Sequence, residues 1–139
     1  MNGKYTWLAI ILAIFLLIPG TAIGWLGMSL VLPPESDYSN SDLTGILLIV
    51  DRGIMVFVRT VPHGYLGGIF SIITTSNLIG GANLKVVAYS VTILLTAYAI
   101  IFIVFISPTS QWDTWDTYGL ICQTLGYGLG LFSIGLINK

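Results

Sequence analysis

The chain has 139 residues, of which 55% are apolar and only 8% are charged, with five basic against six acidic side chains. Soluble domains carry roughly 25% charged residues, so this chain has too few charges to cover a surface in water. The near-neutral balance and the lack of any Lys or Arg run exclude a nucleic-acid binder. With a mean hydropathy of +0.92, a soluble enzyme and a disordered regulator are excluded as well. We predict an all-α, polytopic integral membrane protein whose residues 1–139 form a single membrane domain.

The predicted transmembrane helices follow from uncharged windows of membrane-spanning length. A bilayer core is about 30 Å thick and takes about 20 apolar residues in a helix. The first window resembles a signal peptide at its start, but its apolar run continues past Pro19 to Leu32, which predicts an uncleaved span. Four windows qualify, covering about residues 7–32, 64–84, 86–107 and 118–138.

The segment between the first two windows, about residues 42–61, has helical periodicity and internal charge. Its apolar residues recur at the i, i+3, i+4, i+7 spacing of one helix face, and Pro62 is expected to end it. A charge at the centre of a span costs about 2.5 to 3.5 kcal/mol, so we predict an amphipathic helix at the membrane interface, capped by Ser41 or Asp42. The alternative is a fifth span with a buried ion pair. Three ionisable residues occupy the opposite face of this helix: Asp51, Arg52 and Arg59.

The charged residues also predict an orientation. With four spans, Lys4, Lys85 and Lys139 all lie on one side of the membrane. Lysine-rich loops remain in the cytoplasm, so we expect both termini on the cytoplasmic side. Five spans would scatter the lysines over both sides. Five acids lie on the opposite side in the four-span arrangement: Glu35, Asp37, Asp42, Asp113 and Asp116.

Pairs of glycines four residues apart recur in three of the predicted spans. This spacing lets helix backbones approach closely, which favours association in lipid. We expect close packing within the chain or against a partner, with space for a flat cofactor or a lipid tail as the alternative. The candidate packing residues are Gly20 and Gly24, Gly64 and Gly68, and Gly126 and Gly130.

His63 is the single histidine and Cys122 the single cysteine. A self-contained zinc or iron site needs three or four ligands, so no metal site is predicted from this chain alone. Imidazole can ligate haem iron or chlorophyll, or bond a quinone, and His63 is therefore the candidate cofactor residue of a site shared with another subunit. The alternative is an interfacial histidine that hydrogen-bonds a loop.

Trp112 and Trp115 alternate with acidic residues after the third window, where indole rings settle at the headgroup level. Together with Asp51, Arg52 and Arg59 they are candidates for contact with a partner or with lipid. Ionisable groups near a membrane are functional candidates by default.

Function is predicted from what the chain lacks and from its packing glycines. No nucleophile elbow, phosphate-binding loop or zinc-protease motif is present. We expect a small non-catalytic subunit of a larger membrane complex, of an energy-converting kind such as a respiratory or photosynthetic assembly. Its expected partners are other integral membrane subunits and lipid, with neither nucleic acid nor a soluble substrate. Two alternatives are a homo-oligomeric channel or transporter, with the polar second span facing the pore, and a subunit that shares a haem, chlorophyll or quinone site through His63.

Overall fold

The computed structural model describes residues 3–32, 44–106, 108 and 113–137, and this part of the chain is all-helical. A short 3-10 helix, Gly3–Tyr5, leads into the first long helix. A π-helical stretch, Phe102–Ile106, extends the third. The long helices are α1 (Thr6–Val31), α2 (Ile46–Leu78), α3 (Leu84–Ile101) and α4 (Thr114–Ile137).

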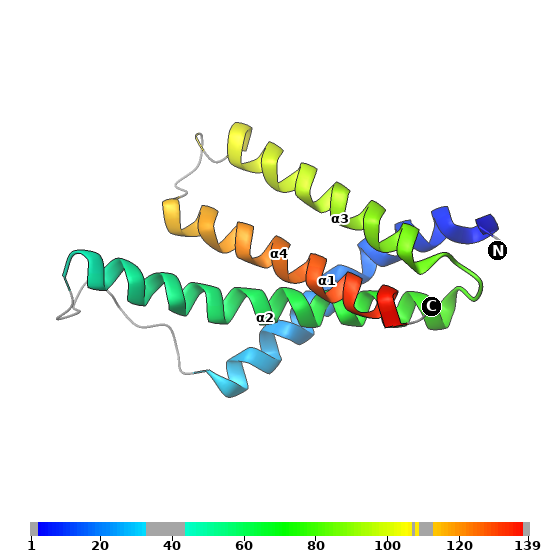
Figure 1. The fold of residues 1–139 in the computed structure, drawn as a ribbon, viewed down its shortest axis with the longest axis horizontal. Coiled ribbons are helices and arrows are strands. Elements are labelled where there is room, and N and C mark those ends of the chain that lie inside the picture. Colours follow the sequence, from blue (N-terminus) through cyan, green and yellow to red (C-terminus); the bar gives the residue numbers. More distant parts are fainter. Residues whose placement is uncertain (1–2, 33–43, 107, 109–112, 138–139) are drawn as a thin grey trace.

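The four helices run alternately in opposite directions (Figure 1). The turn between α2 and α3 lies at the same end of the bundle as the start of α1, because the Asn83 amide donates to Thr6 Oγ1 at 3.4 Å. Lys4 and Lys85 therefore share this end, which we call the lysine end. At the opposite end, the guanidinium carbon of Arg52 lies 4.8 Å from the centre of the Trp115 ring and joins α2 to α4.

Two of the described helices are long and apolar enough to cross a membrane, Thr6–Val31 and Leu84–Ile106, with 26 and 23 residues. They include most of the first and third predicted spans. Several charged residues of the predicted orientation lie outside the described residues: Glu35, Asp37, Asp42 and Lys139.

The structure corrects the prediction for the segment after α1. A separate amphipathic helix was expected to end at Pro62, but α2 continues from Ile46 to Leu78 with Pro62 inside it. Proline removes one helix hydrogen bond, and packing against neighbouring helices makes this loss tolerable. Since residues 42–61 and 64–84 contribute to one helix, the alternative with five separate spans is wrong for the described residues.

The start of α2 differs from the expected one. Ser41 or Asp42 was expected to cap the helix, and both lie outside the described residues. In the structure α2 begins at Ile46, directly after Gly45. Gly45 has a positive φ of 63°, a conformation that glycine adopts without steric cost. The chain therefore enters α2 through a glycine turn.

α2 is the central element of the bundle and makes its most extensive contacts with α4 and α1. Small buried residues form one stripe of α1, including Ala9, Ala13 and Gly20. Ala13 and Gly20 of this stripe contact α2. The main hydrophobic cluster joins this stripe to Ile72 of α2 and to residues of α3 and α4 near the lysine end. Short side chains let the helix axes approach closely, so packing depends on backbone proximity more than on bulky core residues.

The first part of α2 presents its apolar stripe outward. Ile46 is 79% exposed and Leu47 is 67% exposed, and Val50 and Ile54 are exposed as well. Arg52, by contrast, is half-buried against the neighbouring helix. A soluble protein places its apolar residues inside. Here the apolar residues face outward and the arginine faces a neighbouring helix, which is typical of a helix whose surroundings are apolar.

Candidate functional site

Two glycine contacts bring α2 and α4 together. A Cβ atom on Gly68 would lie 2.6 Å from the Tyr127 carbonyl oxygen and 3.2 Å from Gly130 Cα. A Cβ atom on Gly126 would meet the Val61 carbonyl oxygen and lie 3.1 Å from Gly64 Cα. Real Cβ atoms essentially never come this close to backbone atoms, so the observed separation of the two helices requires glycine at these positions.

A second pair of glycines brings α1 against the adjacent face of α2. A Cβ atom on Gly20 would lie 2.8 Å from the Gly67 carbonyl oxygen, and one on Gly24 would lie 2.5 Å from the His63 carbonyl oxygen. The structure thus places all six glycines singled out in the sequence at contacts between helices of this chain. Gly67, which was not singled out, completes the set.

The glycine contacts surround a polar cluster where α1, α2 and α4 cross. His63 Nε2 lies 2.8 Å from the Thr21 carbonyl oxygen. The Tyr127 hydroxyl bonds Thr21 Oγ1, and Gln123 Nε2 donates to the Tyr127 hydroxyl at 2.9 Å. The Tyr127 ring passes over Gly67, where a Cβ atom would lie only 2.9 Å from Cε1 of the ring. We call Thr21, His63, Gln123 and Tyr127 the crossing cluster.

The Leu17 carbonyl oxygen at the end of this hydrogen-bond chain determines which group donates in each bond. Thr21 Oγ1 donates to the Leu17 carbonyl oxygen at 2.5 Å, and a carbonyl oxygen can only accept. The Tyr127 hydroxyl must therefore donate to Thr21, and Gln123 must present its Nε2 group to Tyr127. This fixes the orientation of the Gln123 amide and directs its Oε1 atom away from the bond to Tyr127. No described residue donates to Gln123 Oε1.

His63 donates through Nε2 because its partner is a carbonyl oxygen, which leaves Nδ1 as the nitrogen that an external ligand could contact. Within the described residues, no group of three or more His, Cys, Asp and Glu side chains could hold a metal ion. Cys122 is buried and makes no disulfide. In this structure His63 joins α2 to the backbone of α1.

The candidate contact residues gather at the end of the bundle opposite the lysine end. Trp115 lies under Arg52 and packs edge-on against Tyr118, with 6.1 Å between ring centres. Asp51 is exposed, and Trp112 lies outside the described residues. These side chains therefore belong to α2 and α4 together rather than to a free interfacial helix.

Asp113 and Asp116 cap the start of α4 reciprocally. The Asp116 amide donates to Asp113 Oδ1 at 2.8 Å, and the Asp113 amide donates to Asp116 Oδ2 at 3.1 Å. This pair satisfies two amides that a helix start leaves unpaired. The spacing of the two acids in the sequence could have revealed this cap.

Arg59 lies one turn before His63 on α2. It lines a small pocket of about 190 Å³ between α1 and α2. Trp25, Met28 and Ser29 of α1 form the opposite wall. Arg59 is half-buried, so it faces the bundle rather than the surroundings.

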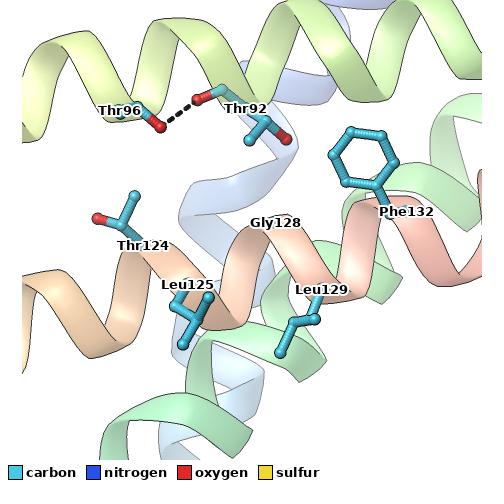
Figure 2. Close-up of a pocket in the computed structure, with 7 residues that line it drawn as sticks. All are labelled: Thr92, Thr96, Thr124, Leu125, Gly128, Leu129 and Phe132. Carbon is cyan, nitrogen blue, oxygen red and sulfur yellow. Dashed lines mark hydrogen bonds between the residues drawn. The ribbon is translucent and has the colours of Figure 1, made fainter.

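Two larger grooves border α3. One, of about 510 Å³, lies between α3 and α4 (Figure 2), and its walls are largely apolar apart from three threonines. Thr96 already donates to the Thr92 carbonyl oxygen at 2.8 Å there. The other groove, of about 410 Å³, lies between α1, α3 and α4, and its polar wall is formed by Thr21, Gln123, Thr124 and Tyr127.

Sequence reasoning found His63 but missed the role of Thr21 and Tyr127. The available signal was a set of polar residues, Thr21, Gln123 and Tyr127, inside uncharged windows where each needs a hydrogen-bond partner. Their sequence separation hides their proximity, because the contact depends on how α1 crosses the other helices (Figure 1).

Comparison of the chain with models of known protein families, with curated proteins and with solved structures finds no match.

Proposed function

We propose that the chain is a small non-catalytic subunit of an integral membrane complex, in which all four helices cross the membrane and both termini lie on the cytoplasmic side. The observation that carries this proposal is the outward apolar stripe on the first part of α2. Arg52, on another face of the same segment, packs inward against Trp115. Such a helix is stable only where its surroundings are apolar.

The length of α2 supports a partner in addition to lipid. At 1.5 Å per residue, 33 residues span roughly 50 Å, whereas the hydrocarbon core is about 30 Å thick. When the glycine contacts lie within the membrane, the first turns of α2 extend into the headgroup region. Ile46 and Leu47 are largely exposed there, so a partner subunit covers them in the assembled complex.

Polar side chains of α2 favour this function over a channel formed by identical chains. Ser71 and Thr75 are fully buried, and Ser71 Oγ donates to the Ala13 carbonyl oxygen at 2.6 Å. Ser71 therefore packs against α1, and neither side chain is exposed to line a shared pore. An energy-converting complex stays a prediction from the sequence.

Purification from the native membrane in mild detergent tests the proposal. The tagged chain is expected to co-migrate with several different integral membrane proteins in one complex. An Ile46→Asn, Leu47→Asn variant should release these partners, whereas the matched Ile93→Asn variant on exposed α3 should retain them. A symmetric ring made only of this chain would contradict the proposal.

A further inference from the structure

The groove between α1, α3 and α4 combines an apolar body with a single polar wall. Ile14, Leu17 and Ile18 of α1 and Leu95 of α3 form much of its apolar lining. Gln123, Tyr127, Thr21 and Thr124 form its polar wall near the middle of the bundle. The Thr124 hydroxyl already donates to the Leu120 carbonyl oxygen at 2.8 Å. The groove reaches the surface between Ile18 and Tyr98, which are 71% and 58% exposed. In a membrane this opening faces the lipid chains.

The hydrogen-bond directions within the crossing cluster define what this wall can recognise. The protons of Thr21 and Tyr127 are used inside the cluster, and Gln123 Nε2 supplies one proton to Tyr127. Gln123 Oε1 remains as an acceptor without a donor among the described residues. A polar group in an apolar environment is costly without a hydrogen-bond partner, so the groove favours a ligand that donates a hydrogen bond.

We propose that this groove binds a lipid alcohol, whose hydroxyl group donates to Gln123 Oε1 and whose hydrocarbon body lies along the apolar walls of α1 and α3. An ester or a quinone carbonyl only accepts and cannot satisfy Oε1. A charged amine would pay a large desolvation cost at this depth. An uncharged hydroxyl group avoids both problems.

The neighbouring groove between α3 and α4 provides an internal comparison (Figure 2). It is larger, at about 510 Å³, and its polar lining consists of three threonines. Thr96 and Thr124 donate to carbonyl oxygens of their own helices at 2.8 Å. The Thr92 hydroxyl is buried there without a partner among the described residues, but a hydroxyl group can both donate and accept, so this groove does not select for a ligand that donates.

Photolabelling of the full chain in phosphatidylcholine nanodiscs tests the proposal. The probes are diazirine-bearing forms of a diacylglycerol, a sterol and a long-chain quinol, each compared with its own methyl ether, which cannot donate a hydrogen bond. At least one alcohol should label α1, α3 or α4 peptides bordering the groove, at a half-saturating concentration about fivefold below that of its ether. The alcohol that shows this difference identifies the class of lipid.

Two variants assign the preference to the groove. Gln123→Met keeps the length of the side chain but removes the acceptor, and it should label equally with alcohol and ether. Thr92→Val alters only the neighbouring groove and should keep the preference. Equal labelling by all alcohols and ethers in the unmodified protein would overturn the proposal, as would a preference that persists in Gln123→Met or disappears in Thr92→Val. The inference needs only that the bundle lies in lipid, so its failure leaves the proposed partner subunits untouched.

Discussion

At the residue scale, Tyr127 links three helices with one side chain. Its ring lies on Gly67 of α2, its hydroxyl donates to Thr21 of α1, and it accepts a hydrogen bond from Gln123 on its own helix. The glycine is what allows this position, because any Cβ at residue 67 would collide with the ring. The hydrogen bonds and the helix packing at this crossing therefore depend on the same few residues.

Replacing Tyr127 with Phe should lower the free energy of unfolding by about 1 kcal/mol. The variant keeps the ring on Gly67 but removes the hydroxyl that bonds Thr21 and Gln123, and hydrogen bonds between membrane helices contribute about this much. Reversible unfolding in mixed micelles measures the difference. Tyr89→Phe is the control, since Tyr89 is exposed and contacts Phe132 through its ring alone. Equal stability of the two variants would refute the role of the Tyr127 hydroxyl.

At the element scale, the contact between α2 and α4 depends on glycines at defined positions rather than on glycine in general. Gly126 lies against the backbone of α2, whereas a Cβ on Gly119 would only touch Val56 Cγ1 at 3.8 Å. Both glycines belong to α4, and both appear in an uncharged window of the sequence. Spacing alone singled out Gly126 as a packing candidate, while its contacts with α2 required the structure.

Gly126→Ala should destabilise the protein by about 2 kcal/mol, because the new methyl group forces the two backbones apart. Gly119→Ala should leave stability unchanged or raise it, since alanine favours a helix over glycine by about 1 kcal/mol and the methyl group has room. Unfolding midpoints of the two variants provide the comparison. The account of this contact fails if Gly119→Ala is the more damaging change.

The reciprocal cap of Asp113 and Asp116 should hold the first turn of α4 in place. Asp113→Ala removes an acceptor from the Asp116 amide and should cost about 1 kcal/mol. Hydrogen–deuterium exchange should speed up at the amides of residues 116 and 117 and stay unchanged near Gly126. Thr114→Ala, next to the cap and exposed, should have little effect. Unaltered exchange in Asp113→Ala would show that the cap does not stabilise this turn.

Also at the element scale, the periodicity of residues 42–61 predicted a helix, which the structure shows from Ile46 onward, but it did not predict that this helix continues past Pro62. Pro62 and Gly64 together are a strong stop signal in isolated helices. Packing against α4 overrides this signal, because Gly64 lies against Gly126 and α2 contacts α4 from Trp115 to Leu131. The helix-breaking tendency of Pro62 and Gly64 is a local effect, and here the tertiary contacts outweigh it.

At the scale of the whole molecule, composition was sufficient to predict an all-helical fold, which the structure confirms for the residues it describes. The charge pattern predicted that Lys4, Lys85 and Lys139 lie on one side of the membrane. The bond between Asn83 and Thr6 places Lys4 and Lys85 at one end of the bundle, and the side of the membrane stays a prediction. The crossing cluster could not be predicted from the sequence, because Thr21 and Tyr127 are 106 residues apart. Only the crossing of α1 over α2 and α4 brings them into contact.

The central claim is that every long helix crosses the membrane, so that the lysine end and the Asp113 end lie on opposite sides. Single cysteines in a Cys122→Ala background test it most directly. Lys4→Cys and Gly80→Cys report the lysine end, where a side chain on Gly80 meets nothing within 4 Å, and Thr114→Cys reports the other end. With a membrane-impermeant maleimide, the first two should react only from the cytoplasmic side and Thr114→Cys only from the opposite side. Reaction of Gly80→Cys and Thr114→Cys from the same side would contradict the account.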